Sequence, residues 1–407
     1  MMDIRPYDQA RDLRNAERIW HEIGWVETPQ QASHLKDFLS AGSCLTGCLR
    51  GGVECLVHTV PGSIRYLEEE LKLCVVTAVT TSRIARRQGF AQKITALQLA
   101  EAALDGAEVA ALGIFDQGFY DKVGFGTGSY EHTFKFDPAT LLVDREFGVP
   151  TRLDKGDWKD MHAAMTSRLR GHGGCNLDPP ILMKAEAGFA ENGFGLGYYS
   201  GESLTHFFWC DAKGEHGPYV IAMIAYRNKD QLLELLALIK SLADQVSSVE
   251  MNEPQHLQLQ SLLREPFRTR RNTRNSEHAN RHHSAAWWQI RILNLAGCLA
   301  RHHWHGDAFA FNLRLSDPIE RHLQDNNWQG VGGDYVVRIG ATSSVEKGLQ
   351  TGLPELTTSV NAFSRLFFGV VSASGLGYTD HFEVEAPLVA QLDAAFCLPT
   401  PRTTWDF

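Results

Sequence analysis

Residues 75–104, VVTAVTTSRIARRQGFAQKITALQLAEAAL, decide how the first part of this chain folds. The stretch opens with a β-branched run that predicts a strand over 73–81, and it closes with apolar residues at helical spacing over 90–104. Between them stands RRQGFA, residues 86–91. Glycine lets a ligand approach the backbone closely, and the free N–H groups at a helix start attract phosphate. The pattern therefore allows two interpretations, an ordinary turn or a phosphate cradle that includes Arg86 and Arg87.

The composition is that of a soluble globular protein. The chain has 407 residues, of which 43% are hydrophobic and 21% charged, so two or three domains are expected. Its net charge of −9 argues against nucleic acid as the main partner. The N-terminal segment carries charge where a secretory signal needs an apolar core, and no stretch approaches the roughly 18 apolar residues of a membrane span. We therefore expect a cytoplasmic protein without a membrane partner.

The eight cysteines form no CxxC pair, which favours reduced and mostly buried thiols. Cys44, Cys48, Cys55 and His58 could in principle form a metal cluster, but packing within strands is the favoured interpretation. The histidines of RHHWHGD (301–307) invite the same question, and a surface role is favoured for them. No metal site is expected.

Three segments differ in texture. The first, to about residue 140, alternates helix and strand, which is typical of an α/β domain. Its expected helices cover 16–23 and 90–104, and its expected strands cover 44–49, 55–60, 73–81 and 109–115. The second segment has strand-like THFFWC (205–210) and PYVIAMIAY (218–226), then a helix over 230–245 and the short SSVEM (247–251). It repeats the order of the first segment, but nothing like RRQGFA precedes its helix.

The third segment begins after an arginine- and histidine-rich stretch, residues 264–284. This stretch is interpreted either as a solvated linker or as a docking surface for an anionic partner, and the linker is favoured. From 285 onward, alternating strand patterns and two short helices near 293–301 and 360–368 predict an α+β unit.

Two motifs together resemble the Gcn5-related N-acetyltransferases (GNAT). RRQGFA stands between a strand and a helix, and FYDKVGFG (119–126) follows the next strand. The whole chain further resembles the Eis (enhanced intracellular survival) family, on WWQIRILNLAGCLA (287–300), SVNAFSRLFFGVVSA (359–373) and the final WDF. The resemblance implies tandem GNAT domains with mixed sheets, over 1–140 and 141–284, the second degenerate. A sterol-carrier-like α+β domain follows over 285–407, in a homo-oligomer such as a hexamer.

The resemblance also implies an activity, acetyl-CoA-dependent N-acetylation of a primary amine by direct attack on the thioester. The acceptor would be a small cationic molecule or a lysine side chain. The residues implied to face the pantetheine and thioester are Val79, Thr80 and Thr81. Those implied to hold the pyrophosphate are Arg86, Arg87, Gln88, Gly89, Phe90 and Ala91.

Tyr120 matches the position of the family's general acid, and a phenol with a pKa of about 10 stays protonated at neutral pH. The alternative is a buried tyrosine that packs beside Phe119 and Phe125. Phe407 matches a terminal carboxylate that the family folds back into its active site, to deprotonate or orient the amine. The alternative for the tail is a frayed terminus.

The acceptor is expected near residues 20–29, with Trp25 as an apolar wall and Glu22, Glu27 and Asp406 attracting a cation. Equally, the tryptophans of this stretch belong to the core and its glutamates to a solvated face. Phe115 and Asp116 depart from the small polar residues of many Eis relatives, which puts a broad aminoglycoside-like acceptor range in doubt. An alternative function is an apolar-ligand carrier that uses the third domain, with the GNAT domains as scaffold.

Overall fold

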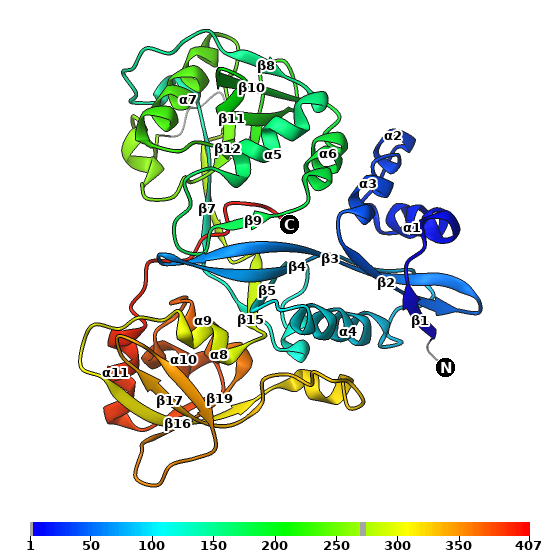
Figure 1. Cartoon of the computed structure of the whole chain (residues 1–407). Coiled ribbons are helices and arrows are strands. Elements are labelled where there is room, and N and C mark those ends of the chain that lie inside the picture. The colour runs from blue at the N-terminus through cyan, green and yellow to red at the C-terminus, as the bar shows by residue number, and fades with distance from the viewer. Residues whose placement is uncertain (1–2, 269–273) are drawn as a thin grey trace.

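The computed structural model describes residues 3–268 and 274–407. Figure 1 shows the first sheet across the middle of the molecule. The second sheet with its helices, which we call the second unit, lies above it, and the third sheet with its helices, the third unit, lies below. The first sheet contains, in spatial order, β1 (Asp3–Pro6), β2 (Ser43–Leu49), β3 (Gly52–Tyr66), β4 (Glu69–Thr81), β5 (Val109–Gly113), β15 (Trp288–Ile292) and β6 (Gly126–Thr127). An eighth strand, β9 (Cys175–Leu177), pairs with β3.

The other two sheets are built mainly from later parts of the chain. The second contains β14 (Arg281–Ala285), β7 (Glu131–Phe136), β13 (Val249–Asn252), β12 (Tyr219–Ala225), β11 (Ser203–Ala212), β10 (Gly193–Ser200) and β8 (Thr151–Leu153). The third contains β18 (Ser344–Lys347), β17 (Gly333–Ile339), β16 (Phe309–Ser316), β19 (Glu355–Ser359) and β20 (Phe382–Val384).

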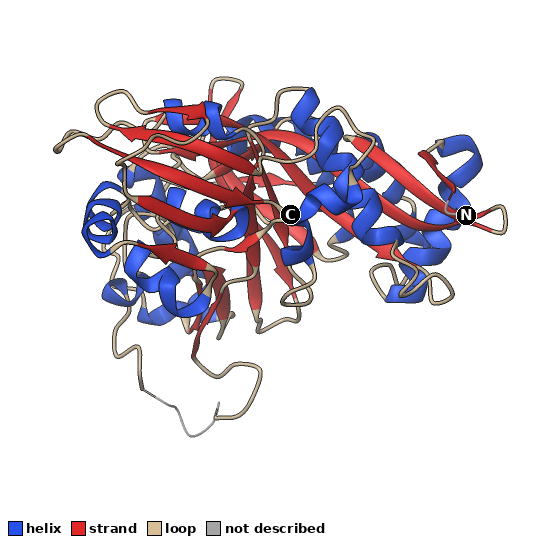
Figure 2. Ribbon diagram, turned by 90° about the horizontal axis from the view of Figure 1, so that it is seen from below, coloured by secondary structure: helices blue, strands red, loops and turns tan. Residues whose placement is uncertain are grey.

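Helices flank these strands, as the view from below also shows (Figure 2). The helices of the first unit are α1 (Gln9–Ile23), α2 (Pro29–Ala32), α3 (Leu35–Ser40) and α4 (Phe90–Leu104), and those of the second are α5 (Trp158–Thr166), α6 (Pro180–Phe189) and α7 (Lys229–Ser241). The third unit contributes α8 (Leu295–Ala300), α9 (Val360–Phe367), α10 (Ala373–Thr379) and α11 (Ala386–Ala395). Short 3₁₀ turns are η1 (Tyr120–Val123), η2 (Pro138–Thr140), η3 (Lys155–Asp157), η4 (Leu242–Asp244), η5 (Leu259–Leu262) and η6 (Pro318–His322).

The mixed α/β fold that the sequence predicts is confirmed. α4 spans Phe90–Leu104, the predicted limits, because its apolar residues bury one long face against β2, β3 and β4. β3 is longer than the predicted strand over 55–60, since it forms a long hairpin with β4 that extends past the sheet. The far end of this hairpin buries Tyr66, whose ring stacks on Phe367 of the third unit at 4.3 Å between centroids.

The sheets exchange strands between the segments that the sequence separates. β7 precedes residue 140, yet it pairs with β13 and β14 in the second sheet. β15 follows residue 284, yet it pairs antiparallel with β5 of the first sheet, from Trp288↔Gly113 to Ile292↔Val109. The domain limits 140 and 284 therefore stay a prediction, while the sheets themselves are made of strands from both sides of each limit.

Other features of the sequence can be placed as well. Seven of the eight cysteines are buried as free thiols and Cys397 is exposed. No three His, Cys, Asp or Glu side chains converge as a metal group within 3–268 and 274–407. No helix among these residues is long and apolar enough to cross a bilayer. The arginine- and histidine-rich stretch ends in β14, and its residues 269–273 lie outside the described part.

Candidate active site

The site begins where two parallel strands separate. β4 and β5 pair in parallel from Leu73↔Val109 to Val76↔Leu112, and their pairing then stops although β4 continues to Thr81. The pairing of β3 with β4 shifts register here, so β4 has one extra residue, Thr77. It directly follows Val76, the last residue of β4 that pairs with β5. Such a bulge bends a strand and increases its twist. The edge of Val79–Thr81 that faces β5 is therefore left without a strand partner, and we call the gap the first wedge.

A cleft of about 650 Å³ opens along this wedge and around the following turn. It includes most of the residues predicted to bind the cofactor. Its lining consists of Ile23, Trp25, Val79, Thr80, Thr81, Ala85, Arg86, Arg87, Gly89, Phe90, Ala91, Gln92, Phe115, Asp116, Phe119 and Lys122. Of the predicted cofactor residues, Gln88 is exposed beside the cleft and is absent from this lining.

The turn presents the start of α4 to the cleft. Arg87 (φ 61°) and Gly89 (φ 81°) both lie in the left-handed region, where glycine is the least strained residue. Gly89 caps α4 without any side-chain hydrogen bond, so the first N–H groups of a fifteen-residue helix keep their capacity to donate. Phe90 turns its side chain into the core, where a Cβ on Gly47 would come within 2.4 Å of the ring. Phe90 can thus meet a ligand mainly through its backbone.

Three cations surround the cleft. Arg86, Arg87 and Lys122 are exposed, and within the described chain their side chains make no ion pair or hydrogen bond. By contrast, Arg83 of the same turn donates its side chain and its backbone N–H to Glu22. The two arginines of the predicted cradle therefore remain available to an anion. Lys122 and Gln92 were not among the predicted site residues. The only signal for Lys122 was its position two residues after Tyr120 in FYDKVGFG.

Tyr120 opens η1 at the far side of the cleft and is 3% exposed. Its ring packs edge-on against Phe119 and Phe125, with centroids 4.9 Å and 6.2 Å away. Burial raises the pKa of its phenol above the usual value. The hydroxyl has no hydrogen-bond partner within the described residues. Tyr120 is therefore a core residue, as one interpretation predicts, and its role as general acid stays a prediction.

The C-terminal tail returns to the first wedge along an ordered path. The backbone N–H of Cys175 donates to the Thr403 carbonyl at 2.8 Å, and Glu131 accepts from the Thr403 backbone N–H at 2.9 Å. The Phe407 ring lies 5.5 Å from that of Trp287, and a Cβ on Gly113 would come within 2.7 Å of the Phe407 backbone oxygen. Gly113 ends β5, so the last residue of the tail reaches the point where β4 and β5 separate.

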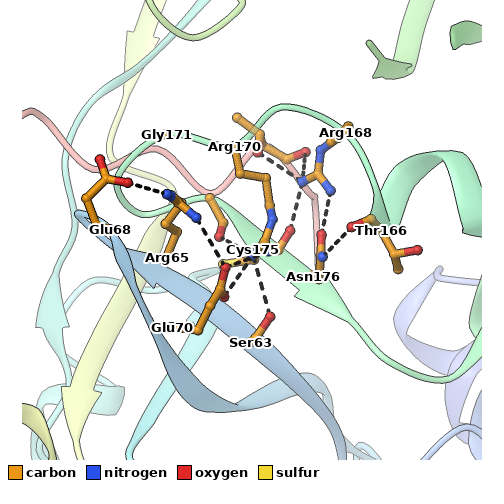
Figure 3. Close-up of polar contacts among 12 residues, drawn as sticks. Ser63, Arg65, Glu68, Glu70, Thr166, Arg168, Arg170, Gly171, Cys175 and Asn176 are labelled. Carbon is orange, nitrogen blue, oxygen red and sulfur yellow. Dashed lines mark hydrogen bonds and ion pairs between the residues drawn. The ribbon is translucent and has the colours of Figure 1, made fainter. Parts of the chain in front are cut away.

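Arg168 fastens the tail from the second unit. Its guanidinium donates to the carbonyl oxygen and Oγ1 of Thr404 at 3.1 and 3.0 Å, and to Asn176 Oδ1 at 2.7 Å. Figure 3 shows this group next to a second cluster, in which Glu70 receives Arg65 and Arg170. Arg168 is 7% exposed and has no carboxylate partner among the described residues, and burial lowers its pKa to about 9. A buried cation is held here because neutral oxygens satisfy its N–H groups.

The structure separates the predicted acceptor residues. Trp25 is 47% exposed and lines the cleft. Glu22 accepts from Arg18 at 2.7 Å and from the Arg83 backbone N–H at 3.0 Å, and these partners hold its pKa below the usual value. Glu27 is exposed next to α2. Asp406 lies on the tail, beside Phe407.

A second wedge in the second unit repeats the geometry of the first. β12 and β13 pair in parallel from Tyr219↔Val249 to Ile221↔Met251, and a register shift against β11 leaves Ala222 as the extra residue. The turn from β12 to α7 spans only 226–228, and Asn228 caps α7 by accepting from the Gln231 N–H. This duplication within one chain agrees with the tandem arrangement expected from the sequence.

Comparison with known proteins places the fold. No protein-family model and no curated protein matches the chain. Among solved structures, it is similar to a probable N-acyltransferase from Enterococcus faecalis (16% identity, TM-score 0.79) and a GCN5-related N-acetyltransferase from Anabaena variabilis (12%, 0.78). It is also similar to Eis1 from Mycobacterium abscessus (15%, 0.75). Each likeness covers 100% of both chains. The chain thus shares its fold over its whole length with GNAT proteins.

Proposed function

We propose that the chain is an acetyl-CoA-dependent N-acetyltransferase that acetylates a primary amine of a small cationic molecule or a lysine. The observation that carries this proposal is the position of Arg86 and Arg87, whose side chains make no ion pair within the described residues, beside the uncapped start of α4 at Gly89. Both features favour phosphate oxygens, through charge-assisted hydrogen bonds and through the helix dipole. The cleft continues from them to the first wedge, where a long and thin thioester arm can lie.

The residues present fit acetyl-CoA. Arg86, Arg87, Gly89 and the first amides of α4 would hold its pyrophosphate, and Lys122 adds a cation at the rim of the cleft. The unpaired edge of Val79–Thr81 offers backbone groups to the pantetheine arm and to the thioester carbonyl. Bound there, acetyl-CoA supplies an activated acetyl group.

Transfer requires the nitrogen lone pair of a neutral amine to attack the thioester carbonyl. The N–C bond forms, the C–S bond breaks, the nitrogen loses a proton, and the sulfur receives one. We assign the proton for sulfur to Tyr120, whose raised pKa keeps the phenol protonated at neutral pH. The amide N–H groups of the β4 edge are the candidates for stabilising charge on the carbonyl oxygen.

We assign the handling of the amine to Phe407 and Asp406. A terminal carboxylate has an ordinary pKa of about 3.5, so orienting a cationic amine suits it better than acting as a strong base. Asp406 is exposed as a residue. Partial burial of its carboxylate and then the charge of Glu131 raise its pKa above the usual value. Trp25 is proposed as an apolar wall near the cleft, whereas Glu22 is already occupied by Arg18 and Arg83.

The alternative function, an apolar-ligand carrier in the third unit, is less well supported. The inner side of its sheet is packed directly by helix residues: Phe311 and Leu356 from the sheet and Phe363, Phe367 and Leu388 from α9 and α11 are all fully buried. We further propose a homo-oligomer, as the Eis resemblance implies, which size-exclusion chromatography with light scattering would test.

Calorimetric titration of acetyl-CoA tests the proposed function directly. We expect the wild-type chain to bind, and Arg86→Ala/Arg87→Ala to bind at least a hundredfold more weakly, since each lost charged contact is worth about 1.5–3 kcal/mol. Arg227→Ala, in the corresponding turn of the second unit, is the matched control and should bind normally. A wild-type chain that does not bind acetyl-CoA would contradict the proposal. Equal binding by the double variant would remove the phosphate cradle from it.

A further inference from the structure

The short turn η1 carries Tyr120 as its first residue and needs support from outside. It has only four residues, Tyr120–Val123, and 3₁₀ turns of this kind have poorer hydrogen-bond geometry than an α-helix. The backbone N–H groups of Gly124 and Phe125 close it, by donating to the carbonyls of Asp121 and Tyr120 at 3.1 and 3.3 Å. The carbonyl oxygens at the end of such a turn need further donors from elsewhere in the protein.

Asn361, in the first turn of α9, supplies two of these hydrogen bonds. Its Nδ2 donates to the Asp121 carbonyl inside η1 at 2.9 Å and to the Phe125 carbonyl just after it at 2.7 Å. An amide nitrogen carries two hydrogens, so both contacts can form at once. The packing is close, because a Cβ on Gly126 would come within 2.3 Å of the Asn361 backbone oxygen. One side chain of the third unit therefore joins both sides of the turn that carries Tyr120.

Two arginines hold the carbonyls between those contacts. Arg321 of η6 donates to the Lys122 carbonyl at 2.9 Å, and Arg291 of β15 donates to the Val123 carbonyl. The Arg291 side chain is fully buried, and its other terminal nitrogen lies 2.7 Å from the buried carboxylate of Asp317 in the third unit. The end of η1 is thus held from several directions by residues from late in the chain.

Asn361 itself does not line the cleft, so it can affect the reaction only through the turn. A proton donor must stay within hydrogen-bond reach of the atom that receives its proton, and small displacements lower the rate strongly. We propose that Asn361 is a positioning residue, which fixes η1 from the third unit and so holds the Tyr120 hydroxyl where it can protonate the thioester sulfur. The effect on the reaction rests on the proposed function; the fixing of the turn does not.

Asn312 of β16 provides a matched control in the same unit. Its Nδ2 also donates to two backbone carbonyls, those of Gln350 at 2.9 Å and Leu353 at 3.4 Å. Its Oδ1 in addition accepts from the Gln350 N–H at 2.9 Å. Asn312→Leu therefore removes at least as many hydrogen bonds as Asn361→Leu, but none of them reaches η1.

Hydrogen–deuterium exchange of the backbone amides over 119–126 tests the fixing of the turn without any substrate. We expect exchange in this segment to be at least tenfold faster in Asn361→Leu than in wild type, because the turn opens more often. Asn312→Leu should exchange there as wild type does. Asn361→Ala should behave like Asn361→Leu, which keeps the test valid if the leucine side chain disturbs the packing. Unchanged exchange in both Asn361 variants would overturn the proposal.

Steady-state release of the coenzyme A thiol from acetyl-CoA, with lysinamide as the acceptor, tests the effect on the reaction. We expect Asn361→Leu to lower kcat about tenfold, while calorimetry finds its acetyl-CoA affinity within twofold of wild type. Because Asn361 acts through Tyr120, adding Asn361→Leu to Tyr120→Phe should lower kcat less than twofold further. Asn312→Leu should keep the kcat of wild type.

The outcomes separate this proposal from the proposed function. If Asn361→Leu lowers kcat by the same factor with and without Tyr120→Phe, or no more than Asn312→Leu does, the positioning role is overturned and the proposed function stands. Normal turnover by Tyr120→Phe would overturn the proton donor and the positioning role together. A wild type that binds no acetyl-CoA, or releases no thiol from it, overturns the proposed function, and the exchange measurement then decides the fixing of the turn by itself.

Discussion

The first and second wedges are two versions of one structure within a single chain. Each forms where a parallel strand pair ends, at Val76↔Leu112 in one and Ile221↔Met251 in the other, next to a one-residue bulge. In the first, the turn over 82–89 is long, and α4 begins at an uncapped glycine. In the second, the turn over 226–228 is short, and Asn228 satisfies the start of α7. The wedge is common to both, and the two turns differ in whether they leave the start of the helix without a side-chain cap.

The residues at the two bulges also differ, because only the first bulge buries a pair of polar side chains. His58 is fully buried opposite the first bulge, and its Nδ1 shares a hydrogen bond of 2.7 Å with Thr77 Oγ1. The equivalent pair in the second wedge is Trp209 and Ala222, where no such polar contact exists. Burying a polar pair costs more than burying an apolar one. The first wedge retains this polar pair although burying it costs stability. Such exceptions are typical of functional sites.

Replacing Tyr120 by phenylalanine should give the largest change in rate, because it removes the proposed proton donor for sulfur. We expect kcat to fall about a hundredfold, the lower end of what a general acid contributes. The affinity for acetyl-CoA should stay within twofold of wild type. Steady-state kinetics and calorimetry measure both quantities, with the exposed Tyr378→Phe as control. Normal turnover by Tyr120→Phe would leave Tyr120 as a packing residue only.

The His58–Thr77 pair predicts a pH dependence of stability. Burial lowers the pKa of His58 to about 3, from an ordinary value near 6.5, so the folded protein keeps it neutral. As pH falls from 6.5, the unfolded chain gains a proton at this residue and the folded chain does not. The stabilisation is therefore complete above about pH 6.5 and is lost progressively down to about pH 3. By pH 5 the loss should reach about 2 kcal/mol.

Urea unfolding at pH 7.5 and pH 5.0 isolates this effect when wild type is compared with His58→Gln. The difference in unfolding free energy between the two pH values should shrink in the variant, since glutamine does not titrate. His172 and His302 are also buried with pKa values lowered to about 4, and they contribute equally to both proteins. The exposed His305→Gln should behave as wild type. If the unfolding free energy changes by the same amount between pH 7.5 and pH 5.0 in His58→Gln as in wild type, burial does not lower the pKa of His58 in the folded state.

Displacing the tail should lower turnover about tenfold while leaving acetyl-CoA binding nearly intact. A methyl group on Gly113 would collide with the Phe407 backbone oxygen, and one added residue after Phe407 would move the carboxylate itself. Gly377→Ala, whose Cβ would meet nothing within 4 Å, is the matched control for the first change. If both altered proteins turn over normally, the tail takes no part in the reaction.

The smallest expected effect concerns the cap of the second unit. Asn228→Ala should lower the unfolding free energy by about 1 kcal/mol, since it removes the acceptor for the Gln231 N–H. Acetyl-CoA affinity should not change, because this helix start is not used for phosphate. Urea titration checks the first statement and calorimetry the second, with Asn192→Ala on an exposed turn as reference. A gain in acetyl-CoA binding would mean that the cap alone had closed the second wedge.

Local patterns predicted the strand and the helix that border the first wedge, but not the wedge itself. The strand over 73–81 and the helix over 90–104 depend on side-chain periodicity within a few turns, and the cleft at Arg86, Arg87 and Gly89 follows from their junction. The mixed α/β fold followed from the same alternation. The roles of Tyr120 and Phe407 remain predictions, although Tyr120 lies buried beside the cleft and Phe407 at Gly113.

Features that join distant segments could not be predicted from local patterns. Glu186 lies on a helix that the sequence analysis did not anticipate, and only the fold brings it to Trp405 and Asp406. The acidic residues of 20–29, Glu22 and Glu27, lie close together in sequence, yet Glu22 is already paired with Arg18 and Arg83. The Arg18–Glu22 pair has the i,i+4 spacing of a helical ion pair and could have been read from the sequence, whereas the contact with Arg83 joins distant segments, which residue spacing does not encode.

The pairing of β15 with β5 has a consequence for how the protein is made. β5 is a buried strand whose partner, Trp288–Ile292, is synthesised only after the whole second unit. During translation, the first sheet therefore leaves the ribosome with one edge unpaired, and an unpaired apolar edge promotes aggregation. Strands β8 to β13 of the second unit are synthesised before β15. The second unit can therefore fold while this edge of the first sheet is still unpaired. Completion of the first sheet is thus a late event, which ties the first wedge to the presence of nearly the entire chain.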